Sequence, residues 1–156
     1  MSIMPEIYDV DIPDSQDQIE YSDIDNSTED TPHEYAWDFE KNDFLLKDGK
    51  FIIVEGIEAL KIWTWKALHT PRFRYDIYDE NYGHDIETLI GKNLSYELME
   101  TETKRFVTEC LTRNKYITGI TNFSMKKVNK LASISFTEKT TLDDIDIKDM
   151  STDIPV

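Results

Sequence analysis

Five carboxylates and two arginines lie close together between residues 72 and 87, and they are the side chains best suited to chemistry. They are Arg72, Arg74, Asp76, Asp79, Glu80, Asp85 and Glu87. Two carboxyl groups of the 76–87 segment could serve a cell-wall glycosidase as general acid and as nucleophile or base. The neighbouring guanidinium groups favour ionised carboxylates, however, and so oppose the raised pKa that a general acid needs. We therefore expect no catalytic site here and keep a lysozyme-like glycosidase as the alternative function.

Other catalytic or metal-binding patterns are weaker still. His33, His69 and His84 are scattered, and none stands four residues from another or beside Cys110. The acidic segment lacks the glycine and the further ligands of a calcium loop. Glycine-rich phosphate loops and nucleophile elbows are absent. We expect a protein that is not an enzyme and that holds no metal or cofactor, with Cys110 as a small buried hydrophobe.

The net charge of −15 is carried by the two ends of the chain. Residues 1–34 hold eleven acidic and no basic side chains, residues 138–156 hold six acidic and two basic ones, and residues 35–137 hold fifteen of each. High like charge with low hydrophobicity predicts flexible acidic tails around one neutral domain. An acidic chain without a basic stripe is not expected to bind nucleic acid, and no apolar run is long enough to span a membrane.

Hydrophobic periodicity predicts an α+β domain in residues 35–137. A strand at 35–40, a turn at 47–50 and a strand at 51–54 form an N-terminal β-hairpin. Two main helices follow, at 57–69 and from an N-cap at Ser95 to Arg113, with a short helix between them that ends at Gly91. Two strands with a turn near residues 127–130 form a C-terminal β-hairpin.

The helix at 57–69 is apolar on two sides. Ile57, Leu60 and Trp63 form an ordinary core stripe, whereas Ile62 and Trp65 point away from it. These two side chains either meet another subunit or are covered by the hairpin or a tail of the same chain.

The segment after Pro71 reads as an extended strand. In that conformation Phe73, Tyr75 and Ile77 would face the core, while Arg72 and Arg74 face outward. The two arginines would then either hold carboxylates of a neighbouring element or subunit, or pair with this chain's own acidic residues.

Several stretches, taken in order along the chain, resemble one protein family. They are the start Trp37-Asp38-Phe39, the helix EALKIWTWKALHT, the segment TPRFRYDIY with Tyr82-Gly83 after it, the turn Ile86–Gly91 and the closing helix with two strands. Together, over residues 35–137, they resemble the PBSX-prophage type of baseplate protein, within the wedge or sheath-initiator family of contractile phage tails.

The resemblance implies an α+β domain similar to the inner domain of the tail sheath, present in several copies, expected to be six, around the tail tube end. Such a protein is a structural baseplate component of a phage or a phage-tail-like bacteriocin. It contacts baseplate wedge and hub proteins, and it starts sheath assembly by accepting extended arms of the tail sheath protein. It would assemble in the bacterial cytoplasm and then reside in the baseplate. The wet face of the last strand, with Ser133, Ser135 and Thr137, would mark the sheet edge that accepts a strand.

This chain departs from the family pattern at two places. The Glu-Pro-Arg triplet expected after the last long helix reads Arg113-Asn114-Lys115, so the contacts of that triplet cannot be carried over. The Gly-Glu-Arg-like segment after the first helix is replaced by Thr70–Arg74, which keeps the basic group and loses the acid.

Overall fold

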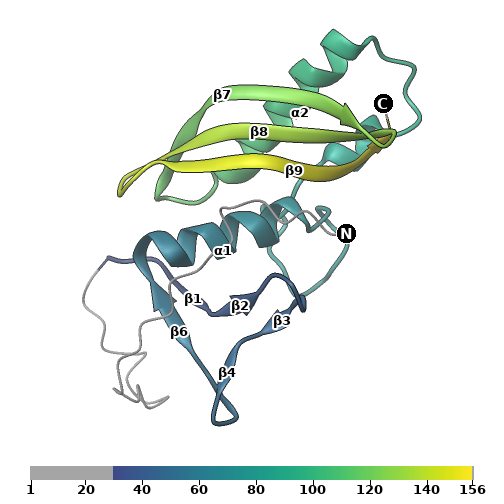
Figure 1. Ribbon diagram of the computed structural model, residues 1–156. Coiled ribbons are helices and arrows are strands. Elements are labelled where there is room, and N and C mark those ends of the chain that lie inside the picture. The colour runs from purple at the N-terminus through teal and green to yellow at the C-terminus, as the bar shows by residue number, and fades with distance from the viewer. Residues whose placement is uncertain (1–29, 156) are drawn as a thin grey trace.

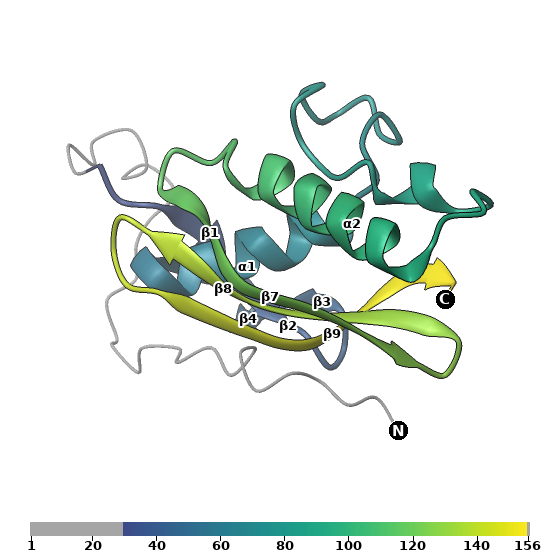
Figure 2. The same cartoon turned by 90° about the horizontal axis from the view of Figure 1, so that it is seen from above.

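The computed structural model of the chain, which describes residues 30–155, is an α+β fold in which helix α1 (Gly56–Leu68) lies between two groups of strands (Figure 1). On one side are the short N-terminal strands. On the other is a three-stranded antiparallel sheet, with helix α2 (Tyr96–Leu111) packed beside it (Figure 2). The α+β class expected from the sequence is confirmed, and no helix of the described residues is long and apolar enough to cross a membrane.

The N-terminal strands form an interrupted hairpin. Its strands are β1 (His33–Tyr35), β2 (Trp37–Asp38), β3 (Asp43–Phe44), β4 (Leu46–Lys47), β5 (Lys50–Phe51) and β6 (Ile53–Glu55). The pairs are β1 with β6, β2 with β3 and β4 with β5, all antiparallel. Asp48 and Gly49 both have positive φ, 51° and 75°, as the predicted two-residue turn requires.

The helix boundaries follow the capping signals in the sequence. Helix α1 ends at Leu68, shortly before Pro71. Ser95 caps α2, and its Oγ accepts a hydrogen bond from the backbone N–H of Leu98 at 3.3 Å. Between the helices, the short 3-10 helix η3 (Ile86–Leu89) stands where the short helix was predicted, and Gly91 follows it with a φ of 79°.

The sheet is built from β7 (Ile117–Val128), β8 (Leu131–Thr140) and β9 (Ile145–Pro155), in the order β7-β8-β9. The predicted C-terminal hairpin is β7 with β8, in a register that pairs Met125 with Ile134. The rings of Phe123 and Phe136 stack across these strands with centroids 6.3 Å apart.

The prediction of a flexible acidic tail at residues 138–156 is wrong, because most of that segment forms β9, the third strand of the sheet. Ile145, Ile147 and Met150 are buried on the core side of β9. Asp146 and Lys148 are exposed on its other face. The charged side chains of this segment thus lie on the solvent-exposed face of a strand. Of the N-terminal acidic tail, residues 1–29 lie outside the described residues, and His33–Tyr35 already form β1.

Helix α1 contributes to two hydrophobic cores. Leu60, Ala67 and Leu68 belong to the larger core beneath the sheet, which also includes η3 and α2. Ala59 and Ile62 belong to a second core formed with the N-terminal hairpin. The two groups of strands are therefore joined through one helix.

Candidate interaction surfaces

The stretch from Thr70 to His84 is a closed loop. At its neck, the N–H of Arg72 donates to the carbonyl of His84 at 2.9 Å, and the N–H of His84 donates to the carbonyl of Thr70 at 3.0 Å. Gly83 has a φ of 94°, and a Cβ at this position would lie 2.5 Å from the Thr70 carbonyl oxygen. Only glycine fits this neck without backbone strain.

The two arginines pair with carboxylates of their own chain. Arg72 Nη1 lies 3.0 Å from Asp85 Oδ2, and its Nε donates to the carbonyl of Glu80 at 2.6 Å. Arg74 Nη2 lies 3.3 Å from Glu87 Oε1, at a more exposed position. Of the two alternatives left open by the sequence, the structure thus shows the intrachain pairs, and Arg72 fastens the two limbs of the loop together.

The prediction of an extended strand after Pro71 is wrong. The apolar residues expected to face the core are exposed instead: Phe73 by 68%, Tyr75 by 54% and Ile77 by 87%. Phe73 has a φ of 62°, and the backbone turns again where Tyr78 N–H donates to the Tyr75 carbonyl. The chain must reverse between the two sides of the neck, which prevents an extended path.

A series of aromatic contacts supports the loop from below. Trp63 of α1 meets Tyr82 edge to face, with centroids 6.0 Å apart, and Tyr82 stacks on Tyr78 at 4.5 Å. Burial raises the pKa of the Tyr82 hydroxyl. On the other side, Arg113 Nη1 donates to the carbonyl of Asn81 at 2.6 Å. The loop tip at Ile77 is therefore held out from the body by contacts at its base.

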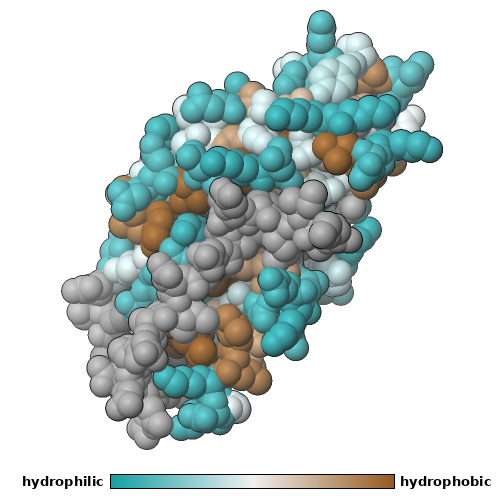
Figure 3. Space-filling model, viewed as in Figure 1, coloured by the Kyte–Doolittle hydropathy of each residue, from teal (hydrophilic) through white to brown (hydrophobic). Residues whose placement is uncertain are grey.

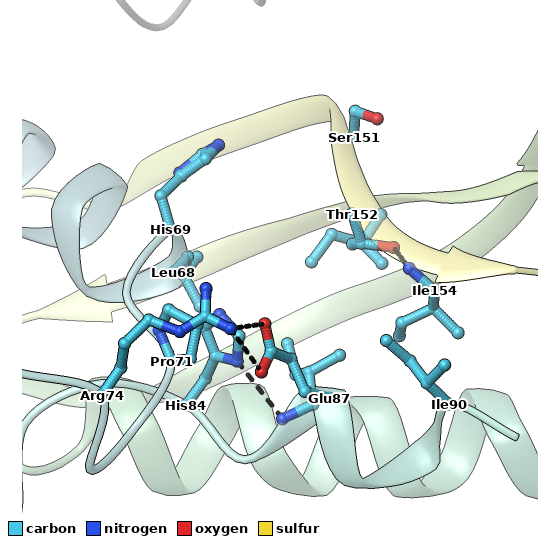
Figure 4. A pocket seen from close by; sticks show the side chains of 12 residues that line it. Leu68, His69, Pro71, Arg74, His84, Glu87, Ile90, Ser151, Thr152 and Ile154 are labelled. Atoms are coloured by element: carbon cyan, nitrogen blue, oxygen red, sulfur yellow. Dashed lines mark hydrogen bonds and ion pairs between the residues drawn. The ribbon is translucent and has the colours of Figure 1, made fainter. Parts of the chain in front are cut away.

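A shallow cavity of about 230 Å³ lies between this loop and β9 (Figure 4). The Arg74–Glu87 pair and His84 line one side, and Thr152 and Ile154 of β9 line the other. His84 Nδ1 accepts the N–H of Ile86 at 3.2 Å. Within residues 30–155, no group of three or more potential metal ligands is found here or elsewhere.

The carboxylates considered for glycoside hydrolysis are not arranged as an acid and a base. Asp85 and Glu87 are each engaged in an ion pair with an arginine of the same chain. The glutamate whose pKa burial raises, to about 7, is Glu138, which is fully buried against α1 and takes a hydrogen bond from Thr64. No observation on the described residues favours the glycosidase.

Ile62 and Trp65 are covered by the N-terminal hairpin. Ile62 is fully buried, so it has no surface to offer another subunit. Trp65 is half-buried, with its ring 5.3 Å from that of Phe39 and stacked on His69 at 4.3 Å. For these two residues the structure therefore shows the second alternative, cover by the same chain.

The same hairpin carries an exposed hydrophobic patch, seen over the N-terminal strands in Figure 3. Phe44, Leu46 and Phe51 are exposed by 39%, 53% and 51%. Phe44 and Phe51 meet edge to face with centroids 5.3 Å apart.

The strand that carries Ser133, Ser135 and Thr137 is not a sheet edge, contrary to expectation. It is β8, the central strand, and its backbone is paired on both sides. Ser133 is buried, Ser135 Oγ accepts the N–H of Asp149 at 2.9 Å, and Thr137 Oγ1 donates to Asp146 at 2.8 Å. Ser135 and Thr137 thus attach β9 to the sheet, and the strand that carries all three residues cannot receive a strand from another chain.

The two edge strands of the sheet, β7 and β9, differ in whether other parts of the chain bond to their outer backbone groups. At Met125 on β7, the N–H donates to Glu100 Oε1 at 3.1 Å and the carbonyl accepts the Tyr96 hydroxyl at 2.5 Å, both from α2. Among residues 30–155, no strand pairs with the outer side of β9. An open edge on β9 was not predicted, although the alternation in Asp144-Ile145-Asp146-Ile147 was the signal that could have revealed it.

Comparison with known proteins agrees with the family named from the sequence. The family model described as contractile injection system sheath initiator matches residues 33–143, from β1 to the connection between β8 and β9. The chain is also 24% identical over 136 residues to the Phage-like element PBSX protein XkdS of Bacillus subtilis (strain 168), a match that covers 85% of this chain and 93% of that protein. The expected resemblance to PBSX-type baseplate proteins is confirmed.

Proposed function

Because this chain belongs to the sheath initiator family of contractile injection systems, we propose that it starts sheath assembly by binding an extended segment of the tail sheath protein along the outer edge of β9. Family membership makes the chain a structural component of a contractile tail, located at its baseplate. Our proposal concerns two further points: that an extended segment of the sheath protein binds, and that the outer edge of β9 receives it.

The outer edge of β9 is the observation that carries this proposal. It extends over 11 residues, Ile145–Pro155, and within the described residues its outer side has no partner strand. An unpaired edge presents a row of N–H and C=O groups to which an extended peptide can add by backbone hydrogen bonds. The central strand β8 is excluded, and part of the β7 edge is occupied by side chains of α2.

Contacts with the other baseplate proteins are proposed at the loop of residues 73–81. Its exposed apolar side chains are preordered by the neck and by the aromatic contacts, so binding would cost little further ordering. In this proposal Arg72 and Arg74 act at the interface indirectly, because they hold the loop that meets the wedge or hub proteins. Six copies around the tail tube end, assembled in the cytoplasm before joining the particle, complete the proposal.

Cross-linking tests the assigned edge. Lys148→Cys on β9 and Lys126→Cys on β7 are matched lysine replacements at exposed positions of the two outer strands. Cys110 is buried and its pKa is raised to about 12 by desolvation, so it will not compete for the reagent. Each variant is mixed with the sheath protein, and cross-links are mapped by mass spectrometry. Cross-links to one extended sheath segment are expected from Lys148→Cys. Cross-links from Lys126→Cys alone would contradict the proposal.

A further inference from the structure

We propose that the cavity between the loop and β9 is an anchor pocket, which takes one aromatic side chain of the extended sheath segment. The anchor pocket is lined by the end of α1, by the loop, by η3 and by β9. Its role rests on the proposed function, because the segment is the one that adds to the outer edge of β9. The pocket adds a requirement of its own, since the segment must carry an aromatic residue at one position.

Two bulges interrupt the outer edge of β9. At Asp149, where φ is 50°, β9 carries one residue more than the stretch of β8 with which it pairs. Between Ser151 and Pro155, four steps along β9 lie opposite the two steps from Ser133 to Leu131 on β8. Bulges bend an edge strand and leave fewer of its backbone groups in line for an added strand. A segment bound here therefore needs a side-chain contact in addition to its backbone hydrogen bonds.

The anchor pocket lies beside the second of these bulges, on the face of the sheet that packs against α1 (Figure 4). Thr152 and Ile154 form its β9 wall. Ile154 belongs to the same buried core as Leu68 and Ile86, which also line the pocket. Side chains of an extended chain alternate between the two faces of a sheet. Every second side chain of an added segment therefore points towards the face that carries the pocket.

The buried part of the anchor pocket is apolar, and its rim is mainly polar. The buried lining residues are Leu68, Ile86, Ile134 and Ile154. The polar side chains beside them, from the end of α1, the loop and η3, are His69, Arg74, His84 and Glu87. A side chain with a large apolar body suits the buried part, and an aromatic ring can also meet the polar rim with its edge or its face.

Size and charge select an aromatic occupant. The pocket has a volume of about 230 Å³, and a cavity of roughly 150 Å³ already holds a benzene ring. A guanidinium group at the rim favours the face of an aromatic ring. A charged side chain is disfavoured, because it would lose its hydration against the buried isoleucines. Arg74 and Glu87 also pair with each other at 3.3 Å, so neither charge calls for a counter-ion from the segment.

Contacts within the chain fix parts of the lining before the segment arrives. His84 Nδ1 accepts the N–H of Ile86 at 3.2 Å. The ring of His69 stacks on that of Trp65, with centroids 4.3 Å apart. A preformed pocket spends little conformational entropy on binding, so the contact with one ring can contribute most of its energy to affinity.

Filling the pocket tests the proposal in the full chain. Ile90 lines the pocket and is exposed by 45%, so Ile90→Trp enlarges the lining without disturbing the core. Leu98→Trp, exposed by 46% on α2 and outside the pocket, is the matched control. Binding of the purified, unassembled sheath protein should weaken about thirtyfold in Ile90→Trp, as it does when an interfacial anchor is lost, and should not change in Leu98→Trp. Equal binding by the unchanged chain and both variants would overturn the proposal.

Photo-cross-linking identifies the side chain that enters the pocket. A diazirine amino acid of similar size at position 90 should cross-link at or next to an aromatic residue of the sheath segment that Lys148→Cys also reaches. Replacing that aromatic residue by alanine should weaken binding about as much as Ile90→Trp does, and the two changes together should add little further. A cross-link to a stretch without aromatic residues would exclude the proposed occupant.

The cross-link at the edge separates the pocket from the proposed function. If Ile90→Trp binds the sheath protein normally while Lys148→Cys still cross-links to its extended segment, the pocket is excluded and the edge stands. If Lys148→Cys forms no cross-link to the sheath protein, the proposed function fails, and the anchor pocket fails with it.

Discussion

Thr64 Oγ1 of α1 donates a 2.8 Å hydrogen bond to Oε2 of Glu138, a carboxyl group that is fully buried in β8. The other oxygen, Oε1, has no hydrogen-bond partner among the described residues. Burial raises the pKa of Glu138 from 4.5 to about 7, because the ionised form loses its hydration and gains only this one bond. One polar contact thus links α1 to the sheet inside an apolar core.

Glu138→Gln should remove part of the pH dependence of stability. The pKa of Glu138 is higher in the folded chain than in the unfolded one, so its contribution is complete below pH 4.5 and is lost as the pH rises through about 7. At pH 8 the variant should be more stable than the unchanged chain by about 2 kcal/mol, because glutamine stays neutral and can still accept the Thr64 bond. Urea unfolding at pH 5 and pH 8 measures the difference. Glu40→Gln, at an exposed position, serves as control. Parallel pH profiles for the unchanged chain and Glu138→Gln would show that the carboxyl is not buried as described.

Gly83→Ala should destabilise the chain by about 2 kcal/mol, because the new Cβ would collide with the Thr70 carbonyl and the residue would be held at positive φ. Gly119→Ala is the matched control, since a Cβ there meets nothing within 4 Å and its φ is not in the left-handed region. Thermal unfolding compares the two variants. Equal melting temperatures would mean that the neck is not closed.

Arg72→Ala should cost more stability than Arg74→Ala. Arg72 is half-buried and holds both the Asp85 carboxylate and the Glu80 carbonyl, so we expect a loss of about 1–2 kcal/mol and faster proteolysis at residues 73–81. Arg74 forms a single exposed ion pair, so its replacement should cost less than about 1 kcal/mol. Chemical denaturation and limited trypsin or chymotrypsin digestion give the two readouts. The reverse order of the two losses would exclude Arg72 as the residue that fastens the loop.

Ile77→Ser should leave the isolated chain as stable as before and reduce its incorporation into baseplates. The side chain is 87% exposed at the tip of a preordered loop, so its apolar surface contributes little to folding. Leu142→Ser, exposed by 47% in the connection between β8 and β9, is the control. Co-sedimentation with assembled particles measures incorporation, and unchanged incorporation of Ile77→Ser would remove the loop from the proposed interface.

Local signals in the sequence sufficed for most elements of the fold. The turn at Asp48-Gly49, the cap at Ser95 and the end of α1 before Pro71 each depend on the backbone preferences of a few adjacent residues. The pairing of β7 with β8 followed from alternation around a short turn. These features need no knowledge of distant contacts.

The errors arose where distant contacts decide the structure. Residues 71–77 alternate like a strand, but the neck formed by Arg72, Gly83 and His84 turns the chain back. Residues 145–155 have the composition of a solvated tail, yet their isoleucines complete the core beneath β8. Ser133, Ser135 and Thr137 were expected on the wet face of an edge strand, but Ser133 is buried, and pairing with β9 makes their strand central.

The alignment of β9 with β8 determines how the sheet resists mechanical load. The two strands are paired from Glu138 and Ile145 at one end to Leu131 and Pro155 at the other. A pull along the axis of β9 loads these backbone hydrogen bonds in shear, so that many must break together, whereas a pull across the strand would peel them one after another. The sheet therefore resists tension most strongly when the force acts along the axis of β9.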